Sequence, residues 1–359
     1  MMETTRVFQT AEETQYLVFA EGKFGKNTSK TANVLLRYQP ERVCAVVDSR
    51  YAGQSVSQRN QSLQSDIPIV ESVEAGMDYS PTHLVIGVAP AGGQLPESWI
   101  KPIKTAIKNG LEIVSGLHTY LSENQELALL ADKHNVSIID LRKPPEFSEI
   151  SQGYWREREI PVLLTIAPDC AMGKFTASWE LKAQLEKRGY QVGFVATGQT
   201  GILLQGEGLV IDAIRGDFMS VAVEQLIMRE IENGADIVLV EGQGAIYHEA
   251  YSSVTLGIVH GAMPEAFLFV HRPGIHCNDY GYEFPPYRQM INDYERLVEW
   301  FKPVHTIGVQ LNTTDFDQET AKSLCEKISH LTGLPTTDLV RFPEDEAINQ
   351  MIHKLYLQE

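Results

Sequence analysis

The stretch LLTIAPDCAMGKFT, residues 163–176, decides the fold expected for the second half of the chain. It continues an apolar run that begins at Pro161, passes through a short loop and enters a helical pattern over Ala177–Arg188. A strand that leads through a loop containing Gly-Lys into a helix is the setting of a phosphate-binding P-loop. Backbone N–H groups at the helix start face an anion there, and the lysine adds a positive charge. We therefore expect a P-loop-containing α/β domain.

The loop departs from the usual GxxxxGK[ST] pattern at two positions. Pro168 stands where the first glycine is expected, and counting from Ala167 makes the loop one residue longer. Phe175 replaces the Ser or Thr whose hydroxyl normally binds Mg²⁺. Thr176 follows directly and is a candidate to contact a phosphate oxygen. These departures favour a loop that grips a phosphate over one that transfers it; the plainer interpretation is a helix start with an exposed lysine.

Two further strand ends favour a ligand site in the same domain. The predicted strand Ile237–Val240 runs into EGQG, residues 241–244, where a P-loop domain places the acidic residue that handles Mg²⁺ or water. The predicted strand Gln191–Ala196 runs into the small, hydroxyl-rich loop TGQTG, residues 197–201. In parallel sheets ligands bind outside the carboxyl ends of strands. We therefore predict one crevice lined by Lys174, Glu241 and the 197–201 loop.

The first half of the chain predicts a separate Rossmann-like domain. Helical patterns at Lys30–Tyr38, Trp99–Asn109 and Glu126–His134 separate short β-branched runs, which indicates βαβ units and a parallel sheet. Asp48 ends the second predicted strand, where acidic residues either contact a nucleotide or simply solvate the strand end. Prolines 144 and 145 suggest a boundary, giving domains at 1–150 and 151–359. The predicted strands are Tyr16–Ala20, Val43–Val47, Ile67–Val70, Leu84–Val88, Ile113–Val114 and Val136–Ile139, then Pro161–Ile166, Gln191–Ala196, Ile237–Val240, Ala266–Val270 and Thr306–Leu311.

Composition restricts the partners and the compartment that we expect. The formal net charge of −17 disfavours a nucleic-acid partner, because an acidic surface repels a polyanion. Four dispersed cysteines without a CxxC motif favour neither a disulfide framework nor a zinc site. The polar first residues lack a signal-peptide core, and no apolar run is long enough to span a bilayer. We expect a cytoplasmic homo-oligomer that binds small molecules, with no membrane partner and no metal site.

Several blocks of the sequence resemble a bacterial and archaeal family that was long labelled a domain of unknown function and includes D-glutamate N-acetyltransferases. The resemblance covers essentially the whole chain and implies a Rossmann-like N-terminal domain joined to a P-loop domain similar to dethiobiotin synthetase. Family members usually carry Gly and Thr where this chain has Ala167 and Pro168. The blocks are IGVAPAGGQLP (86–96), GLH (116–118), DLRKPP (140–145), DCAMGKFT (169–176), ATGQTG (196–201), EGQG (241–244) and VTLGIVHG (254–261).

This resemblance implies transfer of an acetyl group from acetyl-CoA to the amine of an acidic amino acid similar to D-glutamate. Coenzyme A carries an adenosine diphosphate moiety, so a P-loop that binds without hydrolysing suits it. Two alternatives stay open: an ATP- and Mg²⁺-dependent carboxylate-activating ligase, and a non-catalytic nucleotide-binding protein. Phe175 argues against the ligase, whereas Glu241 argues for it.

Acetyl transfer to an amine requires a base, and a substrate with carboxylates is best bound by arginine. Arg142, Arg215 and Arg272 lie near strand or loop ends, and Arg272 is preferred because it shares a strand end with two histidines. Asn312 resembles the adenine-contacting asparagine of dethiobiotin-synthetase-like folds. The predicted catalytic residues are His248, Glu241 and His276. The predicted cofactor-binding residues are Asp169, Cys170, Ala171, Met172, Gly173, Lys174, Phe175, Thr176 and Asn312, and the predicted substrate-binding residues are Thr197, Gln199, Thr200, Gln243 and Arg272.

Overall fold

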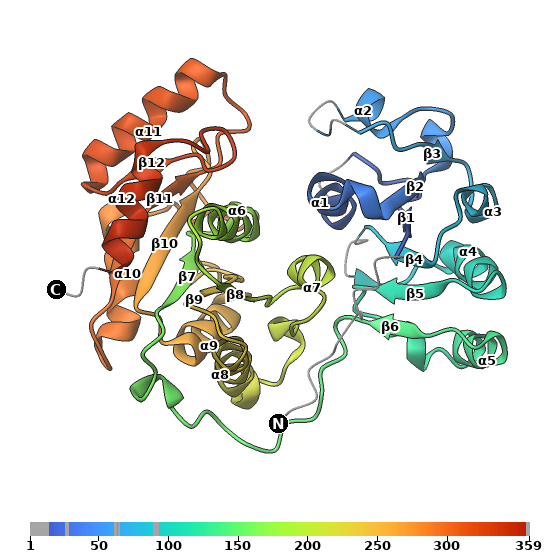
Figure 1. Cartoon of the computed structure of the whole chain (residues 1–359), viewed down its shortest axis with the longest axis horizontal. Helices are drawn as coiled ribbons and strands as arrows, with labels where there is room; N and C mark the ends of the chain where they lie inside the picture. The colour runs from blue at the N-terminus through green and yellow to red at the C-terminus, as the bar shows by residue number, and fades with distance from the viewer. Residues whose placement is uncertain (1–13, 26–28, 61–62, 64, 89–92, 357–359) are drawn as a thin grey trace. The chain divides into compact units, whose positions relative to one another are not determined.

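The computed structural model describes residues 14–25, 29–60, 63, 65–88 and 93–356, which form two compact units. The first unit runs to Pro145 and also takes in Gln199–Ala213, whereas the second comprises Glu146–Gly198 and the chain from Ile214 onward. Each unit is built on one six-stranded sheet in which all strand pairs are parallel (Figure 1). The predicted fold class, two successive parallel α/β sheets, is confirmed.

The sheet of the first unit has the strand order β3-β2-β1-β4-β5-β6, which is the doubly wound Rossmann order. Right-handed crossovers place α1 on one face of this sheet and α3, α4 and α5 on the other (Figure 1). Its strands and helices are β1 (Tyr16–Phe19), α1 (Lys30–Tyr38), β2 (Val43–Val47), α2 (Val56–Arg59), β3 (Ile69–Val70), α3 (Val73–Gly76), β4 (His83–Ile86), α4 (Glu97–Lys108), β5 (Glu112–Ser115), α5 (Gln125–His134) and β6 (Ile138–Asp140).

A helix from the second half of the sequence belongs to the first unit. This helix, α7 (Gln199–Gln205), packs against α1, and the backbone carbonyl of Leu204 accepts a hydrogen bond from the Gln39 side chain. The central part of α7 is buried. The sequence predicted a loop over residues 197–201, but the structure begins a helix at Gln199. The apolar run that follows in ILL, residues 202–204, explains why this segment folds as a buried helix.

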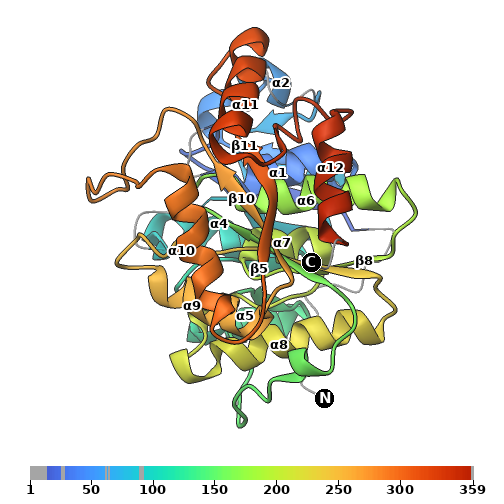
Figure 2. The same ribbon diagram turned by 90° about the vertical axis from the view of Figure 1, so that its left-hand side faces the viewer.

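The sheet of the second unit has the order β12-β11-β10-β7-β9-β8. Helices α8, α9 and α10 pack side by side on one face, and α6 and α12 lie on the other; Figure 2 shows α10 and α12 on opposite sides of β11. The elements are β7 (Val162–Ile166), α6 (Lys174–Glu186), β8 (Val192–Val195), α8 (Gly216–Glu232), β9 (Ile237–Val240), α9 (Ser252–Ala262), β10 (Ala266–His271), α10 (Tyr287–Glu299), β11 (His305–Leu311), α11 (Gln318–Thr332), β12 (Thr336–Thr337) and α12 (Glu346–Leu355).

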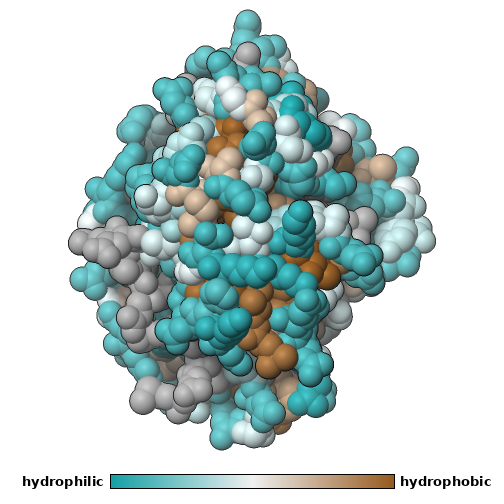
Figure 3. Space-filling view, turned by 90° about the vertical axis from the view of Figure 1, so that its right-hand side faces the viewer, coloured by the Kyte–Doolittle hydropathy of each residue, from teal (hydrophilic) through white to brown (hydrophobic). Residues whose placement is uncertain are grey.

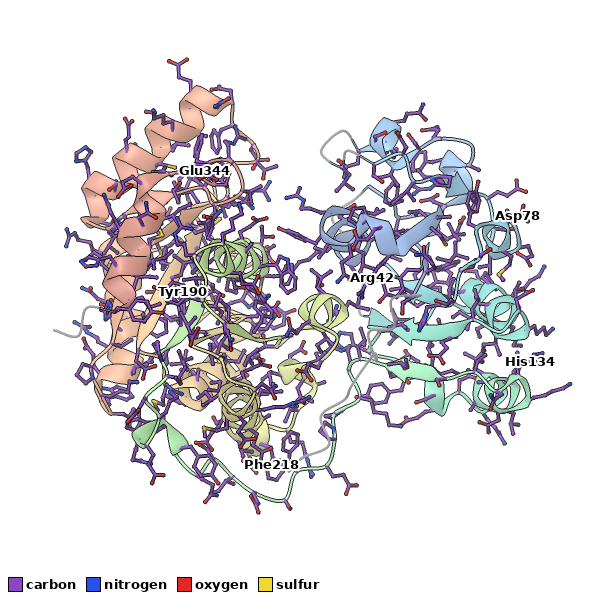
Figure 4. All side chains as sticks on the ribbon, viewed as in Figure 1. Arg42, Asp78, His134, Tyr190, Phe218 and Glu344 are labelled. Atoms are coloured by element: carbon purple, nitrogen blue, oxygen red, sulfur yellow. The ribbon has the colours of Figure 1, made fainter. Side chains whose placement is uncertain are left out.

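Burial explains why the central strands form where they do. Strands β1, β7, β9 and β10 are buried along their whole length, as expected for parallel strands covered by helices on both faces. Two stacked aromatic pairs connect peripheral segments of the second unit. Phe218 of α8 stacks on Phe147, and Tyr190 stacks on Tyr356 after α12 (Phe218 and Tyr190 are labelled in Figure 4). The two-residue edge strand β12 was not predicted, because so short a strand leaves no periodic signal.

The face of the first unit that carries α3, α4 and α5 is mostly hydrophilic, with apolar residues in narrow strips between polar ones (Figure 3). Leu129 on α5 is one of its exposed apolar residues. Across the described part of the chain, no helix combines the length and the apolar composition that crossing a bilayer requires.

Candidate functional site

The loop between β7 and α6 has the backbone shape of an anion-binding turn. Strand β7 lies inside the sheet, between β10 and β9, and α6 begins directly after the loop. Ala171 and Gly173 both have positive φ angles, 56° and 111°, with Met172 between them. Alternation of this kind turns successive N–H groups toward one point, and the first N–H groups of a helix have no partner within it. The predicted strand–loop–helix setting is therefore present.

Lys174 is held inside this loop rather than in solvent. The residue is only 7% exposed, and its Nζ donates a hydrogen bond to the carbonyl of Asp169 at 2.9 Å. The lysine is therefore buried, whereas the plainer interpretation of a helix start expected it to be exposed. The lysine side chain is therefore anchored within the loop, at the start of α6.

Phe175 has no group that could bind a metal, and its side chain lies in the core of the second unit. Its ring is buried and packs against Trp179 and Phe194, with centroid distances of 5.9 and 6.5 Å. The next residue, Thr176, is half-buried at the start of α6. The position that would supply the magnesium hydroxyl has thus become part of an aromatic core.

Glu241, at the end of β9, is a buried carboxylate whose two oxygens are both engaged. One oxygen accepts hydrogen bonds from the backbone N–H groups of Thr197 and Gly198, at 3.2 and 3.3 Å. The other accepts one from the side-chain amide of Gln243 at 2.8 Å. The hydroxyl of Thr197 in turn donates to the carbonyl of Glu241 at 2.6 Å. Glu241 therefore joins the ends of β8 and β9 into one structure, which brings three predicted site residues together.

Gly242 brings the joined ends of β8 and β9 against the loop between β7 and α6, residues 167–173, which we call the phosphate loop. Its N–H donates to the hydroxyl of Thr165 in β7 at 2.9 Å, and a Cβ at Gly242 would lie 1.8 Å from the Thr165 carbonyl oxygen. The same Cβ would lie 3.1 Å from the side chain of Lys174. Only glycine permits this approach. The ends of β7 and β9 therefore meet at Lys174. The sequence predicted this meeting of the segment after β7 with the segment after β9.

Asn312, which follows β11, lies on the other side of the phosphate loop. Its backbone N–H donates to the carbonyl of His271, and its side-chain carbonyl accepts hydrogen bonds from the backbone and hydroxyl of Thr314. A Cβ at Gly173 would lie 3.5 Å from the side-chain nitrogen of Asn312. The structure thus brings the predicted adenine-contacting residue next to the loop, and its role stays a prediction.

His248 lies in an aromatic cluster. It is 3% exposed, and its ring packs against Tyr251 and Tyr280 at centroid distances of 4.5 and 5.2 Å. Within the described residues its Nδ1 atom is buried and has no hydrogen-bond partner. An unpaired imidazole nitrogen is a possible proton acceptor, so the predicted catalytic role of His248 stays open.

The other predicted residues near β10 lie on its outgoing loop. His276 is exposed, and Arg272 forms a two-pronged pair with Asp315 at 2.7 and 2.9 Å. His271 is buried; its Nδ1 accepts from the hydroxyl of Tyr287 at 2.5 Å, while Nε2 faces the carbonyl of Ile275 at 3.2 Å. Burial lowers the pKa of His271 to about 4, so this imidazole is neutral.

Two predicted substrate-binding residues lie in the first unit. Gln199, at the start of α7, accepts a hydrogen bond from the Arg142 guanidinium at 3.3 Å, and Thr200 is buried in the same helix. Sequence reasoning missed Tyr294, a fully buried residue of α10. Its hydroxyl donates to the carbonyl of Ala167 at 2.7 Å and accepts from the N–H of Ile246 at 3.1 Å. No signal in the sequence connects this helix residue with the phosphate loop.

The fold and this site define a two-part protein, a Rossmann-like unit combined with a P-loop unit. Residues 49–144 match the family model described as the DUF1611 N-terminal Rossmann-like domain, and residues 149–348 match the DUF1611 C-terminal P-loop domain. The chain therefore belongs to the DUF1611 family, and the resemblance inferred from its motifs is confirmed.

Two relatives and a solved structure support this membership. A D-glutamate N-acetyltransferase from a Pseudoalteromonas species is 35% identical over 272 residues, 74% of this chain and 79% of the relative. A D-glutamate N-acetyltransferase from Tritonibacter scottomollicae is 30% identical over 332 residues, 92% and 96% of the two chains. The crystal structure of a DUF1611 family protein from Anabaena variabilis is 36% identical, covers 95% of this chain and 99% of its own, and gives a TM-score of 0.89.

Proposed function

We propose that this protein is an acetyl-CoA-dependent N-acetyltransferase whose acceptor is an acidic amino acid of the D-glutamate type. The two relatives named D-glutamate N-acetyltransferase support the reaction class, since one of them matches this chain over nearly its whole length. The reaction joins the acceptor nitrogen to the acetyl carbon and breaks the carbon–sulfur bond of the thioester. The acceptor ammonium loses two protons; one ends on the coenzyme A thiol and the other passes to solvent.

In this proposal the phosphate loop holds the diphosphate of coenzyme A. Lys174 exchanges its bond to the Asp169 carbonyl for a bond to a phosphate oxygen, and the first N–H groups of α6 supply further donors. Asn312, which lies beside Gly173, is well placed to contact the adenine. These groups bind and orient the thioester but take no part in breaking a phosphoanhydride.

The observation that carries the proposal is the state of the two groups that would handle magnesium. Phosphoryl transfer in a P-loop protein requires a loop hydroxyl and an acidic residue near the metal. Here the hydroxyl position is Phe175, buried among aromatic rings, and the acidic residue Glu241 already accepts three N–H bonds. Freeing Glu241 for a metal would leave the N–H groups of Thr197 and Gly198 unpaired in a buried place, at about 1–3 kcal/mol for each. The ATP-dependent ligase is therefore the weaker candidate.

The same bonds define the part played by Glu241. A carboxylate that holds two backbone N–H groups and an amide is suited to positioning the loop after β8, and it is a poor proton acceptor. We therefore propose a positioning role for Glu241. Of the predicted bases, His248 has the unpaired ring nitrogen and His276 the solvent access.

A survey of acceptors tests the proposal. Purified protein is incubated with acetyl-CoA and, in turn, D-glutamate, L-glutamate, D-aspartate and D-glutamine; released thiol and the mass of the product are measured. We expect thiol release and an N-acetylated product with D-glutamate, and much less with uncharged D-glutamine. Thiol release with none of the acceptors would refute the proposal.

A further inference from the structure

A second group of charged residues gathers at strand ends of the first unit, outside the phosphate-loop site. Arg142 follows β6, His118 follows β5, and Gln199 and Asp212 come from the segment Gln199–Ala213 that packs with this unit. The carboxyl ends of neighbouring parallel strands are where α/β sheets bind small ligands. The topology therefore brings a cation, an imidazole, an amide and a carboxylate together at a ligand-binding edge.

Arg142 is the centre of this group. Its side chain is 7% exposed; one guanidinium nitrogen donates to the Gln199 side-chain oxygen at 3.3 Å, and the other lies 3.0 Å from Asp212. A guanidinium has five N–H donors in a planar fork that fits a carboxylate with two parallel bonds. The contact recorded between this fork and Asp212 joins one guanidinium nitrogen to one carboxylate oxygen.

Asp212 is placed so that it can leave. Its side chain is 37% exposed, and it lies on a short 3-10 turn, Ile211–Ala213, rather than in a long helix. Arg142 itself is buried and requires an anionic partner, so Asp212 can leave only when another carboxylate takes its place. A carboxylate from solution that meets the fork with two oxygens would therefore compete with Asp212 for Arg142.

His118 follows β5, the strand that pairs with β6, and is influenced by the charges of both Arg142 and Asp212. Its ring lies against Gly93, where a Cβ would come within 1.9 Å of the imidazole, so that only glycine fits beside it. Burial, and then the positive charge of Arg142, lowers the pKa of His118, while Asp212 raises it. A neutral imidazole beside a guanidinium offers a hydrogen-bond acceptor for an ammonium group next to a site for a carboxylate.

We infer that this group, the Arg142 cluster (His118, Arg142, Gln199 and Asp212), binds the acidic acceptor: a carboxylate of the amino acid displaces Asp212 from Arg142, and His118 faces its ammonium group. This inference rests on the proposed function, which requires an acidic acceptor. It differs from the sequence-based prediction, which assigned the carboxylate to Arg272. Its simplest rival is that Arg142 only anchors the segment Gln199–Ala213.

The variant Asp212→Asn separates the inference from its rival by the sign of its effect. It keeps the shape of the side chain but removes the competing charge. If Arg142 binds the acceptor, KM for D-glutamate should fall, by roughly threefold or more, while KM for acetyl-CoA stays unchanged. If Arg142 only anchors the segment, the variant weakens the fold and KM for D-glutamate does not fall.

Arg142→Lys supplies the opposite arm, because lysine keeps the charge but loses the fork. We expect KM for D-glutamate to rise about tenfold or more, since the two-pronged bond is lost. Arg272→Lys and Asp315→Asn form a matched pair on the other Arg–Asp bridge. Thermal melting of all four variants shows which remain folded. Unchanged KM values in both Arg142 and Asp212 variants, or effects confined to the Arg272 pair, would overturn the inference.

Calorimetric titration with D-glutamate alone separates this inference from the proposed function. Wild-type protein should bind D-glutamate, Asp212→Asn should bind it more tightly, and Arg142→Lys more weakly. This result supports the Arg142 cluster even if acetyl transfer is not observed. Normal acetyl transfer together with unchanged D-glutamate binding in both variants would leave the proposed function standing and refute the site.

Discussion

The phosphate loop and the Arg142 cluster both lie at carboxyl ends of parallel strands, but their charges are held by different partners. In the phosphate loop, Lys174 bonds to a carbonyl, and Glu241 bonds to two N–H groups and an amide. In the Arg142 cluster the cation is paired with an opposite charge, Asp212. A ligand phosphate at Lys174 would replace the bond to the Asp169 carbonyl, whereas a ligand carboxylate at Arg142 would replace Asp212.

This difference leads to an expectation about affinity. Replacing a neutral hydrogen-bond partner by a charged one is favourable, since charge-assisted bonds are about twice as strong as neutral ones. Replacing the Asp212 carboxylate by a ligand carboxylate at Arg142 exchanges one charge pair for another, and the gain is limited to a second hydrogen bond to the guanidinium. We therefore expect the nucleotide-bearing substrate to bind more tightly than the acidic acceptor.

Glycine substitutions compare the packing of the two regions. Gly242→Ala would place a Cβ 1.8 Å from the Thr165 carbonyl oxygen, which is backbone and has little room to move. Gly116→Ala would place one 3.2 Å from the flexible Gln199 side chain. We expect the free energy of unfolding to fall by about 3 kcal/mol or more for Gly242→Ala. A loss of roughly 1 kcal/mol or less is expected for Gly116→Ala.

Urea unfolding of both variants and the wild type measures these losses. Equal losses would contradict the view that the backbone contact at Gly242 is tighter than the side-chain contact at Gly116.

The pH dependence of stability tests whether His271, in the second unit, is buried as a neutral imidazole. His271 has a folded pKa of about 4 against an ordinary 6.5. The unfolded chain therefore binds a proton between these values while the folded chain does not, so the free energy of unfolding falls as pH falls from 6.5 to 4. The loss is roughly 3 kcal/mol for this shift. Urea titrations at several pH values should show this slope in the wild type and a clearly smaller one in His271→Gln.

Lys174→Ala removes the cation of the phosphate loop. The loss of one charge-assisted phosphate contact should weaken coenzyme A binding by about 1.5–3 kcal/mol, which is roughly a ten- to hundredfold rise in Kd. Lys182→Ala on the same helix is the matched control, because Lys182 pairs with Glu186 and packs on Trp179. Isothermal titration calorimetry compares the two. Equal weakening in both variants would mean that α6 acts through its general charge, and the loop would lose its assigned role.

Much of this architecture was predictable because it depends on local pattern. The bounds of α1, β2 and β9 agree with the sequence-based prediction, since each is a compact apolar or amphipathic segment between clear breaks. The Gly-Lys setting of the loop was visible for the same reason. For Phe175 the sequence predicted only the loss of the hydroxyl that normally binds Mg²⁺. It could not predict that the ring packs in an aromatic core, because that depends on a contact with Phe194 in β8.

The parts that were not predictable depend on contacts between distant segments. The apolar run in α7 indicates burial, but nothing in it says that the helix packs with the first unit. Tyr294 contacts the phosphate loop from a helix that lies far along the chain, 127 positions after Ala167. The saturation of Glu241 depends on the register that brings Thr197 and Gly198 to its oxygens. Ala89–Gly92, part of the IGVAPAGGQLP block (86–96) that resembles the family, lie outside the described residues.

One measurement tests the central claim most directly: acetyl transfer with no magnesium and no ATP. The protein is incubated with isotope-labelled acetyl-CoA and D-glutamate in the presence of EDTA, and the labelled product is quantified by mass spectrometry. With Phe175 and Glu241 unable to handle a metal, we expect the same rate of labelled N-acetyl-D-glutamate formation with EDTA as with added magnesium and ATP. A reaction that proceeds only with ATP and magnesium, with release of ADP, would contradict the account and favour a ligase.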